Sequence, residues 1–329
     1  MTSDVWTLGY RYVQHPKNAI GHAHGRYHGK PFEGLFWQTC RLTLSSKQRS
    51  GRPKAVEQMR IGSSNIRDLP RPSFIDWLAE EADVVIKGAA VRCFKLNWSI
   101  DESRLDSWAL HVRRHYMRDG ELSSYVGYYG LSIDDYLQTS VIPDIPQIRS
   151  GDFAEIIVSD LLQFVEGYEV PRYKQHARKD KNASEHGADV IAYKLNNPDI
   201  PCSEDELLTV EVKSRCSSTD LKGGISEAAK DSPRDISRRA INLEYYSRCS
   251  LRDGDMRTAK EIRRFLDAGE HPFVSTFGMG VVAGVKDAKR HLAKFDAGSL
   301  CIEAGSAVFI VHGTKLMKLV NEVYDRCVQ

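Results

Sequence analysis

Two carboxylates and a lysine in the second half of the chain stand at spacings that bring them together. In the segment LLTVEVKS (residues 207–214), the alternation of a β-strand puts Glu211 and Lys213 on the same face. In GADVIAYK (187–194), which also reads as a strand, Asp189 stands at the start. If these two strands are neighbours, Asp189 and Glu211 converge with Lys213 beside them.

Carboxylates that converge at a sheet edge form a hard-oxygen site of the kind that holds Mg²⁺ together with waters and a substrate phosphate. Such an ion polarises a phosphoryl oxygen and lowers the pKa of water, so that hydroxide is available at neutral pH. A neighbouring ammonium group offsets the negative charge that develops in the transition state. The three residues therefore have the composition that phosphodiester hydrolysis needs.

The ordered set of a helical glutamate, a strand aspartate and a Glu-x-Lys strand resembles the PD-(D/E)XK nuclease superfamily. Asp189 precedes Glu211 by 22 positions and follows a predicted helix that carries Glu155, although Ala188 stands where the motif's name has proline. The resemblance implies a Mg²⁺-dependent deoxyribonuclease, with Mn²⁺ as an alternative ion. It implies metal ligation by Asp189, Glu211 and the carbonyl of Val212, and catalytic roles for Glu155, Asp189, Glu211 and Lys213.

A narrower resemblance extends over the arrangement of GDFAEIIVSDLL, a basic stretch, HGADVIAYK and VEVKS behind a long N-terminal region. This arrangement is similar to the HamA family, the nuclease component of the Hachiman anti-phage system. The resemblance implies a bacterial, cytoplasmic defence effector that acts on DNA with a helicase or ATPase partner.

Each of these residues also has a structural interpretation. Asp152 and Glu155 fit a capping box at a helix N-terminus, Asp189 could begin a strand after a turn, and Glu211 with Lys213 could be an exposed ion pair. At the level of function, the alternatives are a non-catalytic nucleic-acid-binding or complex-forming subunit, or the endonuclease of a restriction–modification system.

Two basic segments are predicted to contact the phosphate backbone of a nucleic acid. RYKQHARKDK (172–181) holds five basic residues, and PRDISRRAINLEYY (233–246) carries arginines at helical spacing. Solvated loops and the wet face of a helix would have the same composition. The predicted contacts are Lys174, Lys179, Lys181, Arg234 and Arg238.

The elements that must position these side chains follow from periodicity and from proline and glycine. We expect a boundary near VIPDIPQIRSGD (141–152), with a regulatory or partner-binding α+β domain at 1–145 and the nuclease-like domain at 146–329. The second domain is predicted to be an α/β, restriction-endonuclease-like core, a mixed sheet flanked by helices. Helices are predicted near 72–82, 102–120, 152–167 and 233 onward, with a closing helix over 314–327; strands are predicted near 34–44, 84–98, 187–194, 207–214, 277–285 and 307–313.

Composition is typical of a soluble globular chain. Of its 329 residues 41% are hydrophobic, and the apolar runs are shorter than the roughly 18 residues that cross a bilayer. The first residues have no basic leader followed by an apolar stretch, which argues against a secretory signal. Seven scattered cysteines with no C-x-x-C pair favour reduced thiols. These features predict a cytosolic protein without a membrane partner.

Overall fold

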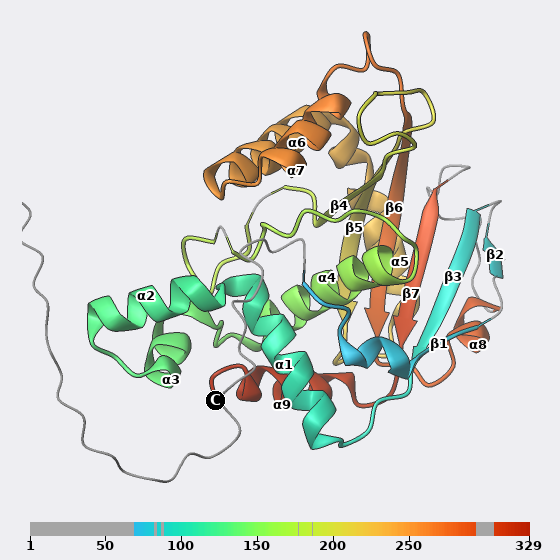
Figure 1. Cartoon of the computed structure of the whole chain (residues 1–329). Helices are drawn as coiled ribbons and strands as arrows, with labels where there is room; N and C mark the ends of the chain where they lie inside the picture. Colours follow the sequence, from blue (N-terminus) through green and yellow to red (C-terminus); the bar gives the residue numbers. More distant parts are fainter. Residues whose placement is uncertain (1–68, 82–83, 87–88, 177, 186, 294–305) are drawn as a thin grey trace, which may run out of the picture. The chain divides into compact units, whose positions relative to one another are not determined.

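A seven-stranded mixed β-sheet runs through the described part of the computed structural model, which comprises residues 69–81, 84–86, 89–176, 178–185, 187–293 and 306–329 (Figure 1). The contacts divide the chain into a unit at Ala55–Gln329 and a separate unit at Met1–Lys54. The latter, with the strand predicted near 34–44, lies outside the described residues. The predicted mixed sheet flanked by helices is confirmed.

Parallel strands form the middle of the sheet and antiparallel strands form both edges. The order is β1, β3, β7, β6, β5, β4, and β2 pairs with β3 beside this path. The strands β3, β7, β6 and β5 are parallel, whereas β4 is antiparallel to β5. Their bounds are β1 Leu78–Glu80, β2 Val84–Ile86, β3 Ala89–Leu96, β4 Val190–Lys194, β5 Glu206–Arg215, β6 Val274–Ala283 and β7 Ala307–His312.

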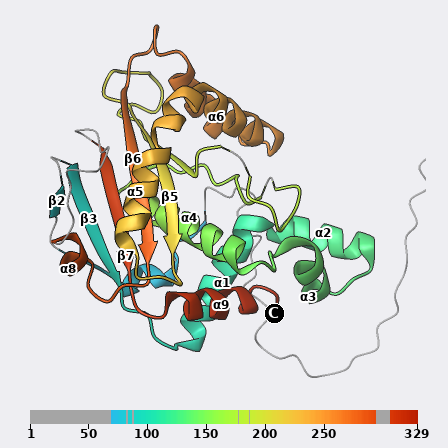
Figure 2. The same cartoon turned by 180° about the vertical axis from the view of Figure 1, so that it is seen from behind.

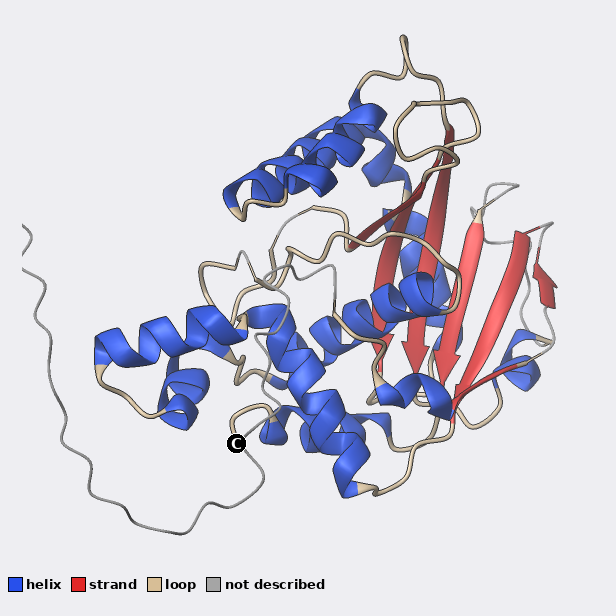
Figure 3. Ribbon diagram, in the orientation of Figure 1, coloured by secondary structure: helices blue, strands red, loops and turns tan. Residues whose placement is uncertain are grey.

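Helices pack on both faces of this sheet (Figure 3). Their bounds are α1 Glu102–Tyr116, α2 Asp119–Tyr129, α3 Ile133–Tyr136, α4 Pro146–Phe164, α5 Leu221–Asp231, α6 Pro233–Arg252, α7 Met256–Arg263, α8 Ala288–Leu292 and α9 Leu316–Arg326, with short turns at Ser73–Trp77, Leu137–Val141 and Arg264–Leu266. None of the helices in the described ranges is long and apolar enough to cross a membrane.

Three clusters of buried side chains divide the core. The largest cluster joins α1, α4 and α9 to one face of the sheet, and a second joins α5 and α8 to the other face. Figure 1 shows α4 in front of the strands, and Figure 2, from behind, shows α5 crossing them on the opposite side. The third cluster packs α6 and α7 against β4. The sheet edge at β4 and β5 therefore lies between α4 and the α6–α7 pair.

The helix α4 lies close to the sheet because its buried face meets a glycine. Phe153, Ile157 and Leu161 form the predicted apolar stripe and are fully buried. A Cβ added to Gly280 of β6 would come within 3.0 Å of a Val158 methyl group, so a larger residue would push the helix outward. Proline at the first helical position starts α4 at residue 146, where its missing N–H leaves no intrahelical bond unmade.

Two predictions about local structure are wrong. The segment 72–82 is not a helix: a short 3-10 turn, Ser73–Trp77, leads into β1, which pairs with β3. Phe74 is buried and stacks on Trp108 at 4.1 Å, so tertiary packing overrides the local helical pattern. The capping box at Asp152 and Glu155 is also excluded, because both residues lie inside α4 rather than at its N-terminus.

The expected domain boundary falls at the first residue of α4, and the sheet draws strands from both sides of it. Residues 91–95 of β3 pair in parallel with residues 308–312 of β7. Beyond the strands, α1 packs on α9 near the end of the chain. Residues 89–116 therefore share their core with the second half of the chain.

Candidate carboxylate and lysine site

Neighbouring strands bring Asp189 and Glu211 together, as the spacing predicted. The antiparallel register pairs Val190 with Val210, and one further step places Asp189 opposite Glu211. The backbone pairing of β4 with β5 ends at Val190. Beyond it, the Asp189 side chain bonds to β5 instead, since its Oδ2 accepts a hydrogen bond from the Val212 N–H at 2.8 Å. The side chain of Asp189 is thus held against the edge of β5.

Glu155 reaches the same place from α4. Its carboxylate is buried, with Oε1 2.9 Å from Lys174 Nζ and Oε2 2.9 Å from Gln175 Nε2. Lys174 Nζ also donates to Asp189 Oδ1 at 2.6 Å. One ammonium group therefore joins the helical glutamate to the strand aspartate.

Lys213 lies at the other end of the cluster. Its Nζ is 2.6 Å from Glu211 Oε1 and 2.9 Å from Asp231 Oδ2 at the last residue of α5. Burial would lower the pKa of Lys213, but the bonds to Glu211 and Asp231 outweigh it and raise the pKa. Lys213 therefore carries a positive charge beside Glu211 across the neutral pH range.

Burial and mutual repulsion disfavour the ionised carboxylates. Burial raises the pKa of Glu155 to about 8; the charges of Asp189 and Asp152 act in the same direction, and Lys174 opposes them. Burial also raises the pKa of Glu211, with Asp189 as the next cause. For Lys174, the carboxylates of Glu155 and Asp189 outweigh burial and raise the pKa. An added positive charge close to Glu155 and Glu211 would stabilise the ionised form of both carboxylates.

The structure separates the five predicted phosphate contacts. Lys174 is 5% exposed and lies within the carboxylate cluster rather than on the surface, where a phosphate contact was predicted. Lys179 and Arg238 are exposed. Lys181 is partly buried and pairs with Asp144 at 2.6 Å, and the side chain of Arg234 lies outside the described residues.

Three partners in the cluster were not identified from the sequence. Lys174 and Gln175 belong to a stretch that was interpreted as a surface segment because five of its residues are basic, and Asp231 precedes a predicted helix without belonging to any motif. The segment after α4 forms a bridge with β4 at Glu169 and Tyr193, and its side chains then reach Glu155 of α4, a path that depends on tertiary packing. Only the concentration of positive charge in 172–181 signalled a functional segment.

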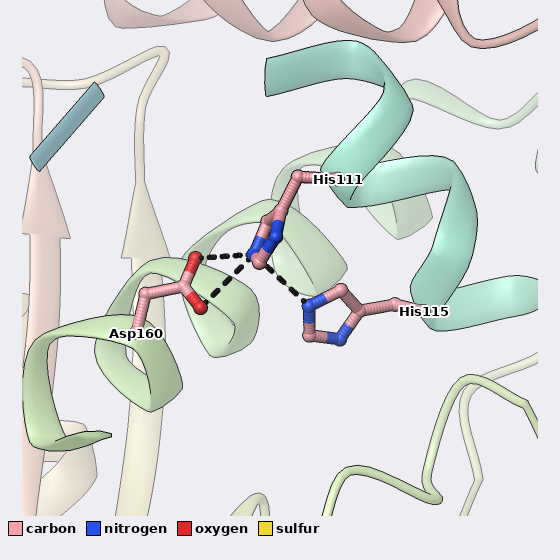
Figure 4. Close-up of side chains that lie close together, drawn as sticks. All are labelled: His111, His115 and Asp160. Carbon is pink, nitrogen blue, oxygen red and sulfur yellow. Dashed lines mark hydrogen bonds and ion pairs between the residues drawn. The ribbon is translucent and has the colours of Figure 1, made fainter. Parts of the chain in front are cut away.

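A second buried cluster joins α1 to α4. His111 and His115 lie one turn apart on α1; His111 points toward Asp160 of α4, and His115 points toward His111 (Figure 4). His111 Nε2 is 2.9 and 3.0 Å from the two carboxylate oxygens, and His115 Nε2 is 3.4 Å from His111 Nε2. Two imidazoles and a carboxylate are also the ligands that a transition-metal ion takes.

A guanidinium group supplies the positive charge in this second cluster. Arg172 Nη1 lies 2.6 Å from Asp160 Oδ1 and 3.1 Å from His115 Nε2. Because a guanidinium only donates, His115 Nε2 accepts, and the proton of this neutral ring is on Nδ1. Burial and the charge of Arg172 hold the pKa of His115 well below its usual value. We interpret the cluster as an internal ion network that fixes α1 to α4.

Comparison with known proteins assigns the chain to a family. No curated protein matches the chain. The family model described as HamA matches residues 72–327. This range includes all seven strands of the sheet and every residue of the carboxylate and lysine cluster. This chain therefore belongs to the HamA family.

Proposed function

We propose that the chain is a divalent-metal-dependent nuclease that hydrolyses DNA phosphodiester bonds at the carboxylate and lysine cluster. The observation that supports this most strongly is the convergence of Glu155, Asp189, Glu211 and Lys213 from α4, the start of β4 and β5. Three segments that are distant in sequence contribute Glu155, Asp189, and Glu211 with Lys213, which is the arrangement that the resemblance to the PD-(D/E)XK pattern implies.

The donor set fits a hard divalent cation such as Mg²⁺ or Mn²⁺. Asp189 and Glu211 would hold it with carboxylate oxygens, and Val212 with its backbone carbonyl. The N–H and C=O of one strand residue point to the same side, and the Val212 N–H already points to Asp189. The raised pKa values of Glu155 and Glu211 are further support, since bound positive charge would relieve them. When bound, the ion would polarise the phosphate and lower the pKa of an attacking water.

The residues of the chain have separate tasks in this proposal. Lys213 places an ammonium group next to Glu211, where it would offset the negative charge that develops on the phosphoryl oxygens. Asp231 holds Lys213 from the side of α5. Glu155, held by Lys174 and Gln175, supports the position of Asp189 through the shared ammonium group.

The family assignment supports a role in anti-phage defence, and we infer that the chain acts with a helicase or ATPase partner.

A second candidate function, a non-catalytic subunit with a nuclease-like fold, is favoured by one observation. The carboxylates of Glu155, Asp189 and Glu211 already have lysine partners, so the cluster is charge-compensated by the chain itself. A restriction endonuclease is a further alternative, which a methyltransferase gene beside this one would support.

The test is DNA cleavage by purified protein, alone and with a helicase encoded beside it, in Mg²⁺ and in EDTA. We expect cleavage with Mg²⁺ only, and a loss of roughly a hundredfold or more in Glu211→Ala and Lys213→Ala. Lys230→Ala is the matched control, because Lys230 is exposed and lies one residue from Asp231 on α5. Undiminished cleavage in the first two variants would exclude this site, and salt-sensitive binding without metal-dependent products would favour the non-catalytic subunit.

A further inference from the structure

Four tyrosines gather on α2 and α3, and three of them face solvent. Tyr125, Tyr128 and Tyr129 of α2 are 44%, 82% and 56% exposed, whereas Tyr136 of α3 is 8% exposed. Tyr125 and Tyr129 each stack on Tyr136, with ring centroids 5.8 Å apart and planes within 19° of parallel. Tyr136 therefore anchors the other two rings, which present large aromatic surfaces outside the core. Exposed apolar surface of this kind marks contact sites.

Two of these rings belong to the lining of a groove of about 520 Å³, which also contains basic residues. Tyr125 and Tyr136 line it together with Arg178, Lys179, Lys181 and Arg252. The two acidic residues of the lining have partners within the chain: Glu121 is 2.8 Å from His176 Nε2, and Asp253 is 2.5 Å from the guanidinium group of Arg118. Lys179 is exposed, and the side chain of Arg252 is 60% exposed. The lining therefore combines aromatic rings with basic side chains: Lys179 and Arg252 are exposed, whereas Arg178 and Lys181 pair with Asp152 and Asp144.

Two residues of the groove lining contact α4 at or next to the carboxylate cluster. Gln175 lines the groove and donates to Glu155 Oε2 at 2.9 Å. Arg178, also in the lining, donates to both oxygens of Asp152 at 2.6 Å, one turn before Glu155 on α4. A ligand in the groove would thus lie beside the side chains that position Glu155.

We propose that this groove binds single-stranded nucleic acid, with unpaired bases stacked on Tyr125 in the lining and on Tyr129, which stacks on Tyr125 outside the lining, and with phosphates at Lys179 and Arg252. This inference rests on the proposed function and adds a substrate class to it, namely strands with unpaired bases at the site of cutting. Base stacking on aromatic rings combined with a basic track is how proteins bind single strands without reading sequence. Duplex DNA keeps its base faces inside the helix, so the tyrosines favour the single strand.

The test measures binding without metal, so that its result does not depend on cleavage. Fluorescence anisotropy in EDTA would use the full chain with a labelled single strand of about 16 nucleotides and, in parallel, the blunt duplex of that sequence. We expect tighter binding of the single strand. Tyr129→Leu should weaken it roughly fivefold or more, because one stacking surface is lost, while Tyr129→Phe keeps the ring and the affinity. Thermal unfolding of each variant would verify that α2 and α3 remain packed.

The salt dependence of binding tests the basic residues of the groove separately. Lys179→Ala and Arg252→Ala should each lower the slope of log affinity against log salt by roughly 0.7, the value for one phosphate contact on a single strand. Lys286→Ala, an exposed lysine before α8 at the opposite end of the molecule, should leave the slope unchanged (Figures 1 and 2).

The outcomes separate this inference from the proposed function. Wild-type single-strand affinity in Tyr129→Leu, or equal affinity for the strand and the duplex, would overturn the inference even in a protein that cuts DNA. Single-strand binding that depends on Tyr129 would support it even if Lys213→Ala left cleavage unchanged. Loss of a protein partner from Tyr129→Leu with unchanged strand affinity would assign the surface to that partner and would also overturn the inference.

Discussion

At the scale of single residues, the position of Lys174 explains how the structure keeps several carboxylates close together. Its side chain is 6% exposed and contacts both Glu155 and Asp189. Without this ammonium group the two acids would be buried near each other with no compensating charge, which a low-dielectric interior strongly disfavours. A lysine predicted to bind a phosphate therefore compensates the charge of the site itself.

The variant Lys174→Met tests this assignment. It keeps the length of the side chain and removes the charge, so we expect the free energy of unfolding to fall by about 3 kcal/mol in denaturant titrations, the cost of breaking a buried pair. Lys230→Ala, on the exposed face of α5, should change stability by less than about 0.5 kcal/mol. A loss below about 1 kcal/mol in Lys174→Met would contradict a charge-compensating role.

At the scale of elements, buried polar contacts attach α1 to α4. The network of His111, His115, Asp160 and Arg172 is one attachment. A second attachment is the hydroxyl of Tyr116, the last residue of α1, which donates to Asp152 of α4 at 2.6 Å. The helix α4 therefore carries Glu155 of the carboxylate cluster and also Asp152 and Asp160, the residues to which α1 is attached.

This attachment predicts a pH dependence of stability. The folded state holds the pKa of His115 well below 6.5, so below about pH 6.5 the unfolded chain binds a proton that the folded chain does not. Stability from this residue is therefore present above pH 6.5 and decreases as the pH falls, with a slope of up to about 1.4 kcal/mol per pH unit. The raised pKa of Glu155 gives a slope of the opposite sign between its unfolded value and about 8, so the total curve mixes the two.

The variant His115→Gln separates the two contributions. Glutamine can still accept from Arg172 but does not titrate, and the contribution of Glu155 cancels when the variant is compared with the wild type. Between about pH 5 and 6.5 the free energy of unfolding should fall more steeply in the wild type than in the variant. Parallel curves for the two proteins would mean that His115 is protonated equally in the folded and unfolded states.

At the scale of the whole molecule, one sheet unites residues on both sides of the expected boundary at 145. A fragment of residues 146–329 would lack β3 and α1, so it would expose the edge of β7 and the core face of α9. We expect this fragment to bind a hydrophobic dye and to unfold without a cooperative transition. Residues 55–329, which keep the whole described unit, are the control. Cooperative unfolding of the shorter fragment would support the division at 145.

The sequence by itself determined most of the strands and helices around the cluster, and it identified Glu155, Asp189, Glu211 and Lys213 as residues that meet there. Strand alternation placed Glu211 and Lys213 on one face, and the apolar stripe identified α4, because both signals are periodicities that a few neighbouring residues carry. The spacing from Asp189 to Glu211 fits two adjacent strands, which the structure confirms. The helix predicted near 72–82 is wrong because Phe74 and its neighbours are held by contacts with residues distant in sequence, such as Trp108, rather than by local preference.

Only the tertiary structure decided the surroundings of that pattern. Lys174, Gln175 and Asp231 reach the carboxylates from a loop and from the end of a helix, and neither has a periodicity that predicts where a side chain points. Burial, which raises the pKa of Glu155, likewise depends on α4 packing against the sheet. Residues that face each other on regular elements can be predicted from spacing, whereas the partners that compensate their charge depend on how the whole chain folds back on itself.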